Sequence, residues 1–485
     1  MTEDLKAKAS RGFAWSVAER FLTQGTLFVV SVVLARLLSP TEYGTIAMLL
    51  VFVNLADVLV TNGLGEALIQ KKSIEQVDYS TILLCGSVLS LFLYILIFIA
   101  APFIGSFYDD PSMTLLLRIL ALRMPLASFN AIQKAYVAKN FLFRKQFLSS
   151  FFGSFLSGGA AIVLALLGYG VFALIAQQLL TVVLCSIFLL ASSKWVPGFR
   201  FSGKSCGELF PLGLQFAGAN LINALYSEGR SLLIGKYYSP AQLALFNRGN
   251  QFPSLIVNNI NTPISNVLLP VMSEVKDDGA KLRNVVKKAI QLAAFFIFPL
   301  MGYLIVAAGP LVDFLLGQQW LGCVVYLQVA CVFYLFQPLQ TMNWQVLKAV
   351  GRGDLCFKLE VLKKSVGFGL LFASVPFGVF WIAAASAVFG ALSMLINMAP
   401  NKKIIGYAIA EQLKDMVKPF VSTGIAMAFG MIPLYLELPS LLTLVVQALT
   451  GLLIYLVVSK VVKSEGLSII VSEVRVRRSK GEANA

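Results

Sequence analysis

Three arginines lie inside long apolar stretches of the sequence, where a permanent positive charge needs a chemical reason. They are Arg20, Arg230 and Arg248. Arginine stays protonated under essentially all conditions, and its planar guanidinium matches the oxygens of a phosphate group. A charge inside a bilayer is costly unless it faces protein or water, so these residues predict a shielded cleft that binds an anionic ligand.

Uncharged polar residues accompany the arginines at helical spacing. Intervals of three and four residues put them on one helix face in each of four apolar stretches. The candidates for contact with a ligand are Asn220, Asn223, Gln251 and Asn258. The alternative role for such groups is hydrogen bonding between helices, which would only hold the bundle together. The pattern favours a polar cleft and leaves both roles open for each amide.

Carboxylates in the same stretches are candidates for carrying a proton or a coupling cation. Asp57 lies in the middle of the second stretch, and Glu19 and Glu228 lie one and two residues from Arg20 and Arg230. These short spacings do not face each other on a helix, but they temper the local positive charge. The sequence contains no histidine, so a proton relay would have to use carboxylates. We expect coupling to a proton or sodium gradient to involve these three residues.

No cofactor, metal or nucleic acid is expected as a ligand. The six cysteines form no CxxC pair and lie mostly in apolar stretches, which argues against a metal site or a disulfide framework. The net charge of +15 comes from basic residues dispersed in small groups rather than gathered on one polar domain. The charge pattern is better explained by membrane topology.

The elements that position these residues are membrane-spanning helices. Of 485 residues, 58% are hydrophobic and 13% are charged, and long apolar runs recur from end to end. With about 20 residues for each crossing, we predict an all-α integral membrane protein of about fourteen transmembrane helices. The expected spans lie near 13–38, 41–68, 79–105, 112–135, 146–167, 170–193, 208–236, 241–272, 284–308, 321–347, 359–377, 379–399, 413–436 and 439–460.

The basic residues predict the orientation of these spans. If the N-terminus is cytoplasmic, the even-numbered loops and both tails should carry the Lys and Arg side chains. Of the 39 basic residues, all but seven fall on that side or at its boundary; the seven are Arg20, Arg36, Arg118, Arg123, Arg230, Lys236 and Arg248. We therefore expect both termini in the cytoplasm and the charged N-terminus to be retained.

An internal repeat divides the spans into two sets. An offset of 200 positions pairs residues 34–44 with 234–244 and matches Ser39 and Pro40 to Ser239 and Pro240. Because each set has an even number of spans, the copies would be related by a pseudo-two-fold axis along the membrane normal. The expected parts are an N-terminal six-helix lobe (1–200), a C-terminal six-helix lobe (201–403), two extra transmembrane helices (404–462) and a basic cytoplasmic tail (463–485).

Several segments carry a family resemblance through their order along the chain. They are LARLLSPTEYG (34–44), Asp57 with NGLGEALIQKK (62–72), NFLFRKQF (140–147), GYGVFALIAQQ (168–178), LLPVMSEV (268–275), FPLMG (298–302) and LGQQW (316–320). This pattern resembles the Wzx-type oligosaccharide flippases of the polysaccharide transporter family, within the multidrug/oligosaccharidyl-lipid/polysaccharide exporter superfamily. It looks closest to the branch that includes the colanic acid exporters. The motifs look largely structural, so no substrate-binding residue is carried over from the family.

The resemblance implies a transporter of the bacterial inner membrane. Such a protein moves undecaprenyl-pyrophosphate-linked oligosaccharide from the cytoplasmic to the periplasmic leaflet by alternating access, for capsular, exopolysaccharide or O-antigen assembly. The implied partners are the lipid-linked oligosaccharide and membrane lipids, with a polysaccharide polymerase and export machinery beyond them. The last two spans resemble the extra pair of fourteen-helix members, where a groove could hold lipid.

Other functions stay open on the sequence alone. A cation-coupled drug exporter of the same superfamily would favour carboxylates in the cleft and usually has twelve spans. A membrane-embedded polymerase or glycosyltransferase would need a long extramembrane loop with catalytic acids, whereas the longest loops expected here have about 10 to 20 residues. A lipid scaffold without transport would not need polar stripes. We therefore expect a transporter without catalytic residues rather than an enzyme.

Overall fold

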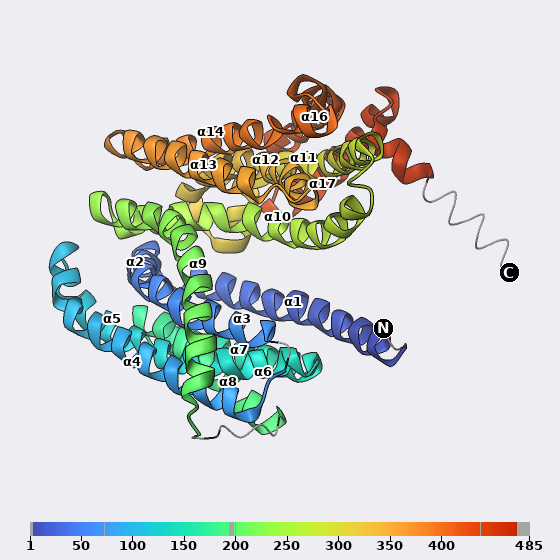
Figure 1. The fold of residues 1–485 in the computed structure, drawn as a ribbon. Helices are drawn as coiled ribbons and strands as arrows, with labels where there is room; N and C mark the ends of the chain where they lie inside the picture. The colour runs from blue at the N-terminus through green and yellow to red at the C-terminus, as the bar shows by residue number, and fades with distance from the viewer. Residues whose placement is uncertain (1–2, 72, 194–197, 199, 437, 473–485) are drawn as a thin grey trace. The chain divides into compact units, whose positions relative to one another are not determined.

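The computed structural model describes residues 3–71, 73–193, 198, 200–436 and 438–472. Every regular element in these ranges is helical, as Figure 1 shows. Ten helical stretches among the described residues are long and apolar enough to cross a membrane. The prediction of an all-α, multi-pass membrane fold is confirmed.

The described chain forms two compact units, Met1–Ala244 and Leu245–Ala485. The helices of the first unit are α1 (Glu3–Leu37), α2 (Pro40–Asp57), the π-helical turn η1 (Val58–Asn62), α3 (Gly63–Gln70), α4 (Gln76–Phe107), α5 (Ser112–Ala121), α6 (Arg123–Lys139), α7 (Phe143–Leu166), α8 (Val171–Ser193) and α9 (Gly203–Tyr237). In α2 to α3 and in α5 to α6, two α-helices together occupy one predicted span.

The second unit begins within α10 (Pro240–Glu274). Its further elements are α11 (Gly279–Leu316), the 3₁₀ turn η2 (Gln318–Cys323), α12 (Val324–Ala349), α13 (Gly353–Ser374), the 3₁₀ turn η3 (Val375–Phe377), α14 (Val379–Met398), α15 (Asn401–Ile405), α16 (Ile409–Gly430), the 3₁₀ turn η4 (Ile432–Leu436) and α17 (Ser440–Val461). Of the tail, residues 465–472 are helical and 473–485 lie outside the described residues.

Helices occupy the places of all the predicted spans, although the count of fourteen crossings stays a prediction. Of the described helices with at least 18 residues, the four that are not among the ten membrane candidates are α1, α9, α10 and α13. Three of these, α1, α9 and α10, are the helices to which the sequence assigns the candidate arginines. Their polar residues are what the expected cleft requires.

The helix boundaries follow the 200-residue offset of the sequence repeat. α1 and α9 both have 35 residues and end at Leu37 and Tyr237, and α2 and α10 begin at Pro40 and Pro240. The serine before each proline accepts a hydrogen bond from the third residue after it, as an N-cap does: Glu42 N donates to Ser39 Oγ over 3.3 Å, and Gln242 N donates to Ser239 Oγ over 3.2 Å. The pseudo-two-fold axis stays a prediction.

Helix α9 packs inside the first unit, against α2, α3 and α4. A Cβ atom added to Gly63 of α3 would lie 2.0 Å from the carbonyl oxygen of Gly213 in α9, so the two backbones touch at this point. Asn54 Nδ2 of α2 also donates to Glu228 Oε1 of α9 over 3.1 Å. The division of the chain at residue 200 stays a prediction, but α9 completes the packing of the first unit.

The contact between α4 and α9 can be checked chemically. The Sγ atoms of Cys85 in α4 and Cys206 in α9 lie 3.4 Å apart. We expect a mild thiol oxidant such as diamide to join them, since little movement is needed to reach disulfide geometry. Maleimide labelling followed by mass spectrometry should show the loss of both thiols and their return after reduction. In the Cys206→Ser variant, Cys85 should stay reactive; two reactive thiols after oxidation of the natural chain would contradict the contact.

In the second unit, α16 and α17 are tied to α11 by polar contacts. The carboxylate of Asp415 in α16 accepts from Tyr407 Oη over 2.5 Å and from Gln291 Nε2 over 3.1 Å, and it pairs with Lys287 at 3.1 Å. Tyr455 Oη of α17 donates to the backbone oxygen of Phe295 over 2.7 Å. The last two predicted spans are therefore built onto this unit.

Candidate functional site

A polar cavity of about 610 Å³ lies within the first unit. Its walls come from α2, η1, α3, α6, α7 and α8, so segments far apart in the sequence enclose it. The charged side chains in its lining are Asp57, Glu66, Arg123 and Lys134. Amide side chains of Asn54, Asn130 and Gln146 complete the polar surface. A cavity of this kind can hold a polar, charged ligand inside a membrane protein.

One face of α6 supplies nearly half of the lining. Arg123, Asn130 and Lys134 are seven and four residues apart, which places them along the same side of a helix. The other residues of α6 that line the cavity are small; they are Ala127, Ala131, Ala135 and Ala138. Alanines leave room in front of the helix, so the two long cationic side chains border open space.

Arg123 and Asp57 form an ion pair through a single contact. Arg123 Nη2 lies 3.4 Å from Asp57 Oδ2, and both side chains are largely buried, with exposed fractions of 24% and 11%. Among the described residues, Arg123 Nε and Asp57 Oδ1 are buried without a hydrogen-bond partner. A bidentate arginine–carboxylate pair would use two parallel hydrogen bonds. The pair therefore retains one donor and one acceptor for a ligand.

The two other predicted carboxylates lie behind amides of the cavity wall. Glu228 Oε1 accepts from Asn54 Nδ2 over 3.1 Å, and Glu19 Oε1 accepts from Gln146 Nε2 over 3.2 Å. Ser150 Oγ also donates to Glu19 over 2.9 Å. Each carboxylate thus uses the amide nitrogen and orients the amide, whose oxygen remains available as an acceptor.

The structure brings together some of the predicted residues and separates others. Asp57 lines the cavity, while Arg230 and Asn220 lie on α9 and are not among the lining residues. The guanidinium carbon of Arg230 lies 5.9 Å from the ring centre of Tyr226. The predicted roles of Arg20 and Asn223 concern side chains outside the described residues. Ligand binding by Arg20, Arg230, Asn220 and Asn223 stays a prediction.

Arg248, Gln251 and Asn258 lie in the second unit, on α10. Arg248 is buried: its Nη1 donates to Gln251 Oε1 over 2.6 Å, and its guanidinium carbon lies 5.3 Å from the ring centre of Trp320. Asn258 is exposed and donates to Ser254 Oγ over 3.0 Å. For Arg248 these contacts are a hydrogen bond within α10 and packing of the guanidinium on an aromatic ring. Ligand binding at these residues stays a prediction.

Sequence reasoning missed the two cations of the cavity. It counted Arg123 among the seven basic residues that are off the cytoplasmic side, and it counted Lys134 only among the residues on that side or at its boundary. The signal was nevertheless present, since Arg123, Asn130 and Lys134 follow the helical spacing used for the other stripes. Two cations on the same face of one predicted span indicate a polar site as well as a single arginine in the middle of a span does.

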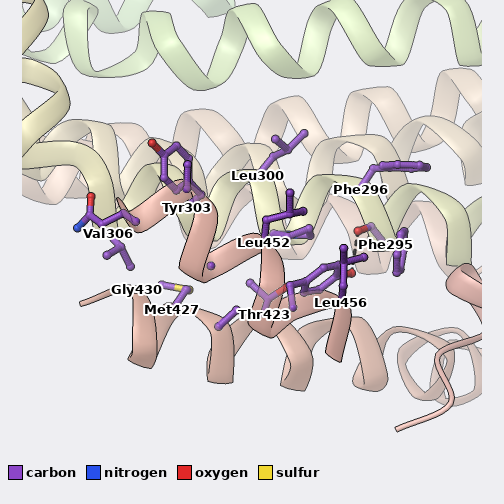
Figure 2. A pocket seen from close by; sticks show the side chains of 16 residues that line it. Phe295, Phe296, Leu300, Tyr303, Val306, Thr423, Met427, Gly430, Leu452 and Leu456 are labelled. Carbon is purple, nitrogen blue, oxygen red and sulfur yellow. Dashed lines mark hydrogen bonds between the residues drawn. The ribbon is translucent and has the colours of Figure 1, made fainter. Parts of the chain in front are cut away.

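A second cavity, of about 440 Å³ and almost wholly apolar, lies in the second unit between α11, α16 and α17. Figure 2 shows Phe296, Leu300, Leu452 and Leu456 around it. Tyr303 Oη donates to the backbone oxygen of Leu444 over 3.1 Å, so the tyrosine presents its ring rather than a free hydroxyl. The walls of this apolar cavity suit a hydrocarbon chain.

Comparison with known proteins decides the family. Residues 33–325 match the family described as polysaccharide biosynthesis protein. The chain belongs to this family. All residues that line the polar cavity fall within the matched range, whereas α16 and α17 lie beyond it. The resemblance to polysaccharide transporters is confirmed.

Curated relatives and solved structures are also similar to the chain. The chain is 25% identical to the succinoglycan biosynthesis transport protein ExoT of Rhizobium meliloti (strain 1021), over 80% of each chain. It is 24% identical to the lipopolysaccharide biosynthesis protein WzxC of Escherichia coli (strain K12), over 93% of this chain and 89% of that protein. The fold is similar to that of the lipid II flippase MurJ in an inward closed conformation, with a TM-score of 0.73 and 16% identity over 93% of this chain and 98% of that one. It is also similar to an inward-facing MATE family multidrug transporter, with a TM-score of 0.62 and 16% identity over 80% and 94%.

Proposed function

We propose that this protein is a flippase that moves lipid-linked oligosaccharide repeat units across the bacterial inner membrane. The observation that carries the proposal is the cavity with Arg123 and Lys134, enclosed by membrane helices of a polysaccharide biosynthesis family member. Two relatives are named as a biosynthesis transport protein and a Wzx protein, and the fold is that of a lipid flippase. No chemical step on the glycan is needed, so the protein is a transporter rather than an enzyme.

The cavity chemistry suits the polar part of such a substrate. Arg123 and Lys134 would bind the pyrophosphate, because its oxygens accept charge-assisted hydrogen bonds from a guanidinium and an ammonium. The amides of Asn54, Asn130 and Gln146 would bind sugar hydroxyls. The undecaprenyl tail can stay in apolar surroundings throughout.

The proposed flippase would have a defined orientation and would be linked to an ion gradient. Both termini would lie in the cytoplasm, because the basic loops then face inside. Transport would run from the cytoplasmic to the periplasmic leaflet by alternating access, coupled to a proton or sodium gradient through Asp57. A polymerase and export machinery would use the product. The glycan could belong to a capsule, an exopolysaccharide or an O-antigen.

Reconstitution into vesicles tests the proposed function. Purified protein is placed in vesicles that contain a fluorescent undecaprenyl-pyrophosphoryl oligosaccharide, and a lectin added outside reports the fraction of glycan in the outer leaflet. We expect protein-dependent movement of the glycan between leaflets, absent from vesicles without protein. Vesicles that export a lipophilic cationic dye and leave the glycan in place would instead indicate the cation-coupled drug exporter, for which the carboxylates Asp57 and Glu66 in the cavity would be the binding groups.

The apolar cavity would accommodate part of the lipid tail. A Cβ atom added to Gly451 of α17, which lines this cavity, meets no heavy atom within 4 Å, so a larger side chain would occupy the cavity without a backbone clash. We expect Gly451→Leu to lower the transport rate about threefold, a modest loss because bilayer lipid is as apolar as the cavity wall. The vesicle assay measures it.

Gly424 of α16 provides the matched control. It is also a helical glycine with open space at its Cβ position, and it is not among the residues that line the cavity. Gly424→Leu should transport at the natural rate. Equal rates for Gly451→Leu, Gly424→Leu and the natural protein would show that the tail does not use this cavity.

A further inference from the structure

The charges of the polar cavity balance one another before any ligand binds. Its described lining has two cations, Arg123 and Lys134, and two carboxylates, Asp57 and Glu66. An anionic ligand therefore adds uncompensated negative charge to a site of low dielectric constant, where such charge is costly. Binding is favourable only if the ligand competes for a cation or if a carboxylate loses its charge.

Asp57 is the carboxylate that such a ligand would affect most. Its contact with Arg123 is a single one, 3.4 Å long, and its other oxygen is buried without a hydrogen-bond partner among the described residues. A phosphate group could draw the guanidinium away by offering it two oxygens in the geometry that arginine prefers. Asp57, 8% exposed, would then be a buried carboxylate without its counter-ion.

The other charged groups around Asp57 would not replace Arg123. α6 also contributes Lys134, which lines the same cavity and would contact the anion itself, and α3 contributes the carboxylate of Glu66. α9 and α1 contribute the carboxylates Glu228 and Glu19, which accept hydrogen bonds from the lining residues Asn54 and Gln146. α8 contributes the apolar Val182. Among the described residues that line this cavity or hydrogen-bond to its lining side chains, the titratable groups other than the two cations are therefore carboxylates.

We propose that Asp57 and the anionic ligand compete for Arg123, so that the cavity takes up one proton on Asp57 when it binds a pyrophosphate. This inference rests on the proposed function and adds a linkage between substrate and proton. By mass action, one proton taken up on binding tightens the affinity about tenfold for each unit by which the pH falls, within the range where Asp57 titrates. A low pH therefore favours the occupied cavity.

The test measures binding of a soluble short-chain prenyl-pyrophosphoryl sugar to the full-length protein in lipid nanodiscs. Its pyrophosphate is a diester whose charge stays constant from about pH 5.5 to about pH 8, so the ligand contributes no pH dependence of its own. Calorimetry in buffers of different ionisation enthalpy gives the affinity and the number of protons taken up. We expect about one proton for the natural protein and tighter binding at lower pH.

Variants assign the proton to Asp57. The Asp57→Asn variant should bind the probe with an affinity that no longer changes with pH. A carboxamide does not ionise in this range and does not compete strongly for Arg123. Asp57→Glu should keep the pH dependence. Glu208→Gln is the matched control, since Glu208 is an exposed carboxylate that pairs with Lys71 at 3.2 Å and does not line the cavity; it should behave as the natural protein.

The possible results are distinguishable. If the natural protein binds the probe without taking up a proton, the linkage is overturned and the proposed function stands. This result does not depend on whether the Asp57→Asn variant folds. The same pH dependence in Asp57→Asn as in the natural protein also overturns it, as does binding that follows sodium concentration instead of pH. Failure of the natural protein to bind the probe at any pH overturns the proposed function and this inference together.

Discussion

Replacing Arg123 with glutamine is expected to lower glycan export more than about tenfold. Hydrogen bonds to a charged group contribute about 1.5 to 3 kcal/mol, and the loss of one from the bound pyrophosphate lowers affinity by about ten- to 150-fold. The substitution also leaves Asp57 buried without a counter-ion, which lowers the free energy of unfolding by about 3 kcal/mol. This value is near the low end for buried ion pairs because the Arg123 side chain is 24% exposed. Export in cells and the vesicle assay give the rate, and immunoblotting gives the amount of protein.

A double substitution separates the two effects of losing Arg123. In Asp57→Asn with Arg123→Gln, neither partner is charged, so the protein should accumulate to the natural level while export stays low. Arg118→Gln is the matched control. Arg118 lies five residues earlier, contacts Phe98 with its guanidinium carbon 4.2 Å from the ring centre, and does not line the cavity. Natural export by the double variant would remove Arg123 from the binding site.

Substituting alanine for Gly63 is expected to destabilise the protein by about 1 to 3 kcal/mol, the usual cost of inserting a methyl group into a well-packed contact. The added Cβ would lie 2.0 Å from Gly213 O and 3.0 Å from Ala217 N, which are backbone atoms that cannot rotate away. Helix α9 would have to move from α3. Thermal unfolding in detergent should show a midpoint lower by several degrees.

Gly65 offers a control two residues along the same helix. A Cβ atom there has its nearest neighbour, the carbonyl oxygen of Ala131, at 3.9 Å. Gly65→Ala should leave the unfolding midpoint unchanged or raise it, because alanine is favoured over glycine in a helix by up to about 1 kcal/mol. Equal midpoints for the two variants would contradict the close contact between α3 and α9.

Close contacts between helix backbones account for a glycine in each of two family motifs. NGLGEALIQKK places Gly63 against α9, and LARLLSPTEYG ends at Gly44, where an added Cβ would lie 1.8 Å from the carbonyl oxygen of Pro240. Both glycines allow helix backbones to touch, which is how membrane helices pack closely. The interpretation of these motifs as structural agrees with these contacts.

The candidate site could be predicted only in part. Asp57 was identified because a carboxylate in the middle of an apolar span is conspicuous by itself, and the structure places it in the cavity. Arg248 was equally conspicuous, yet its guanidinium packs against Trp320 and Gln251 in the second unit. Conversely, Arg123 counted only as one of the seven basic residues off the cytoplasmic side, and Lys134 counted only as a residue of that side or its boundary, yet both lie in the cavity wall. Whether a polar side chain meets a cavity or a neighbouring residue depends on helices distant in the sequence.

The sequence alone determined the helix lengths, the membrane environment and the family. It also determined the matched helix boundaries 200 residues apart. These properties depend on local hydropathy, capping residues and the order of motifs, which are read one segment at a time. Only the tertiary structure decided which polar helix face lines a cavity. That outcome depends on alanines of α6 that leave room before Arg123 and Lys134, and on Asp57 reaching Arg123 from another helix. The pairing of those faces is a property of packing between distant segments, and no single span contains it.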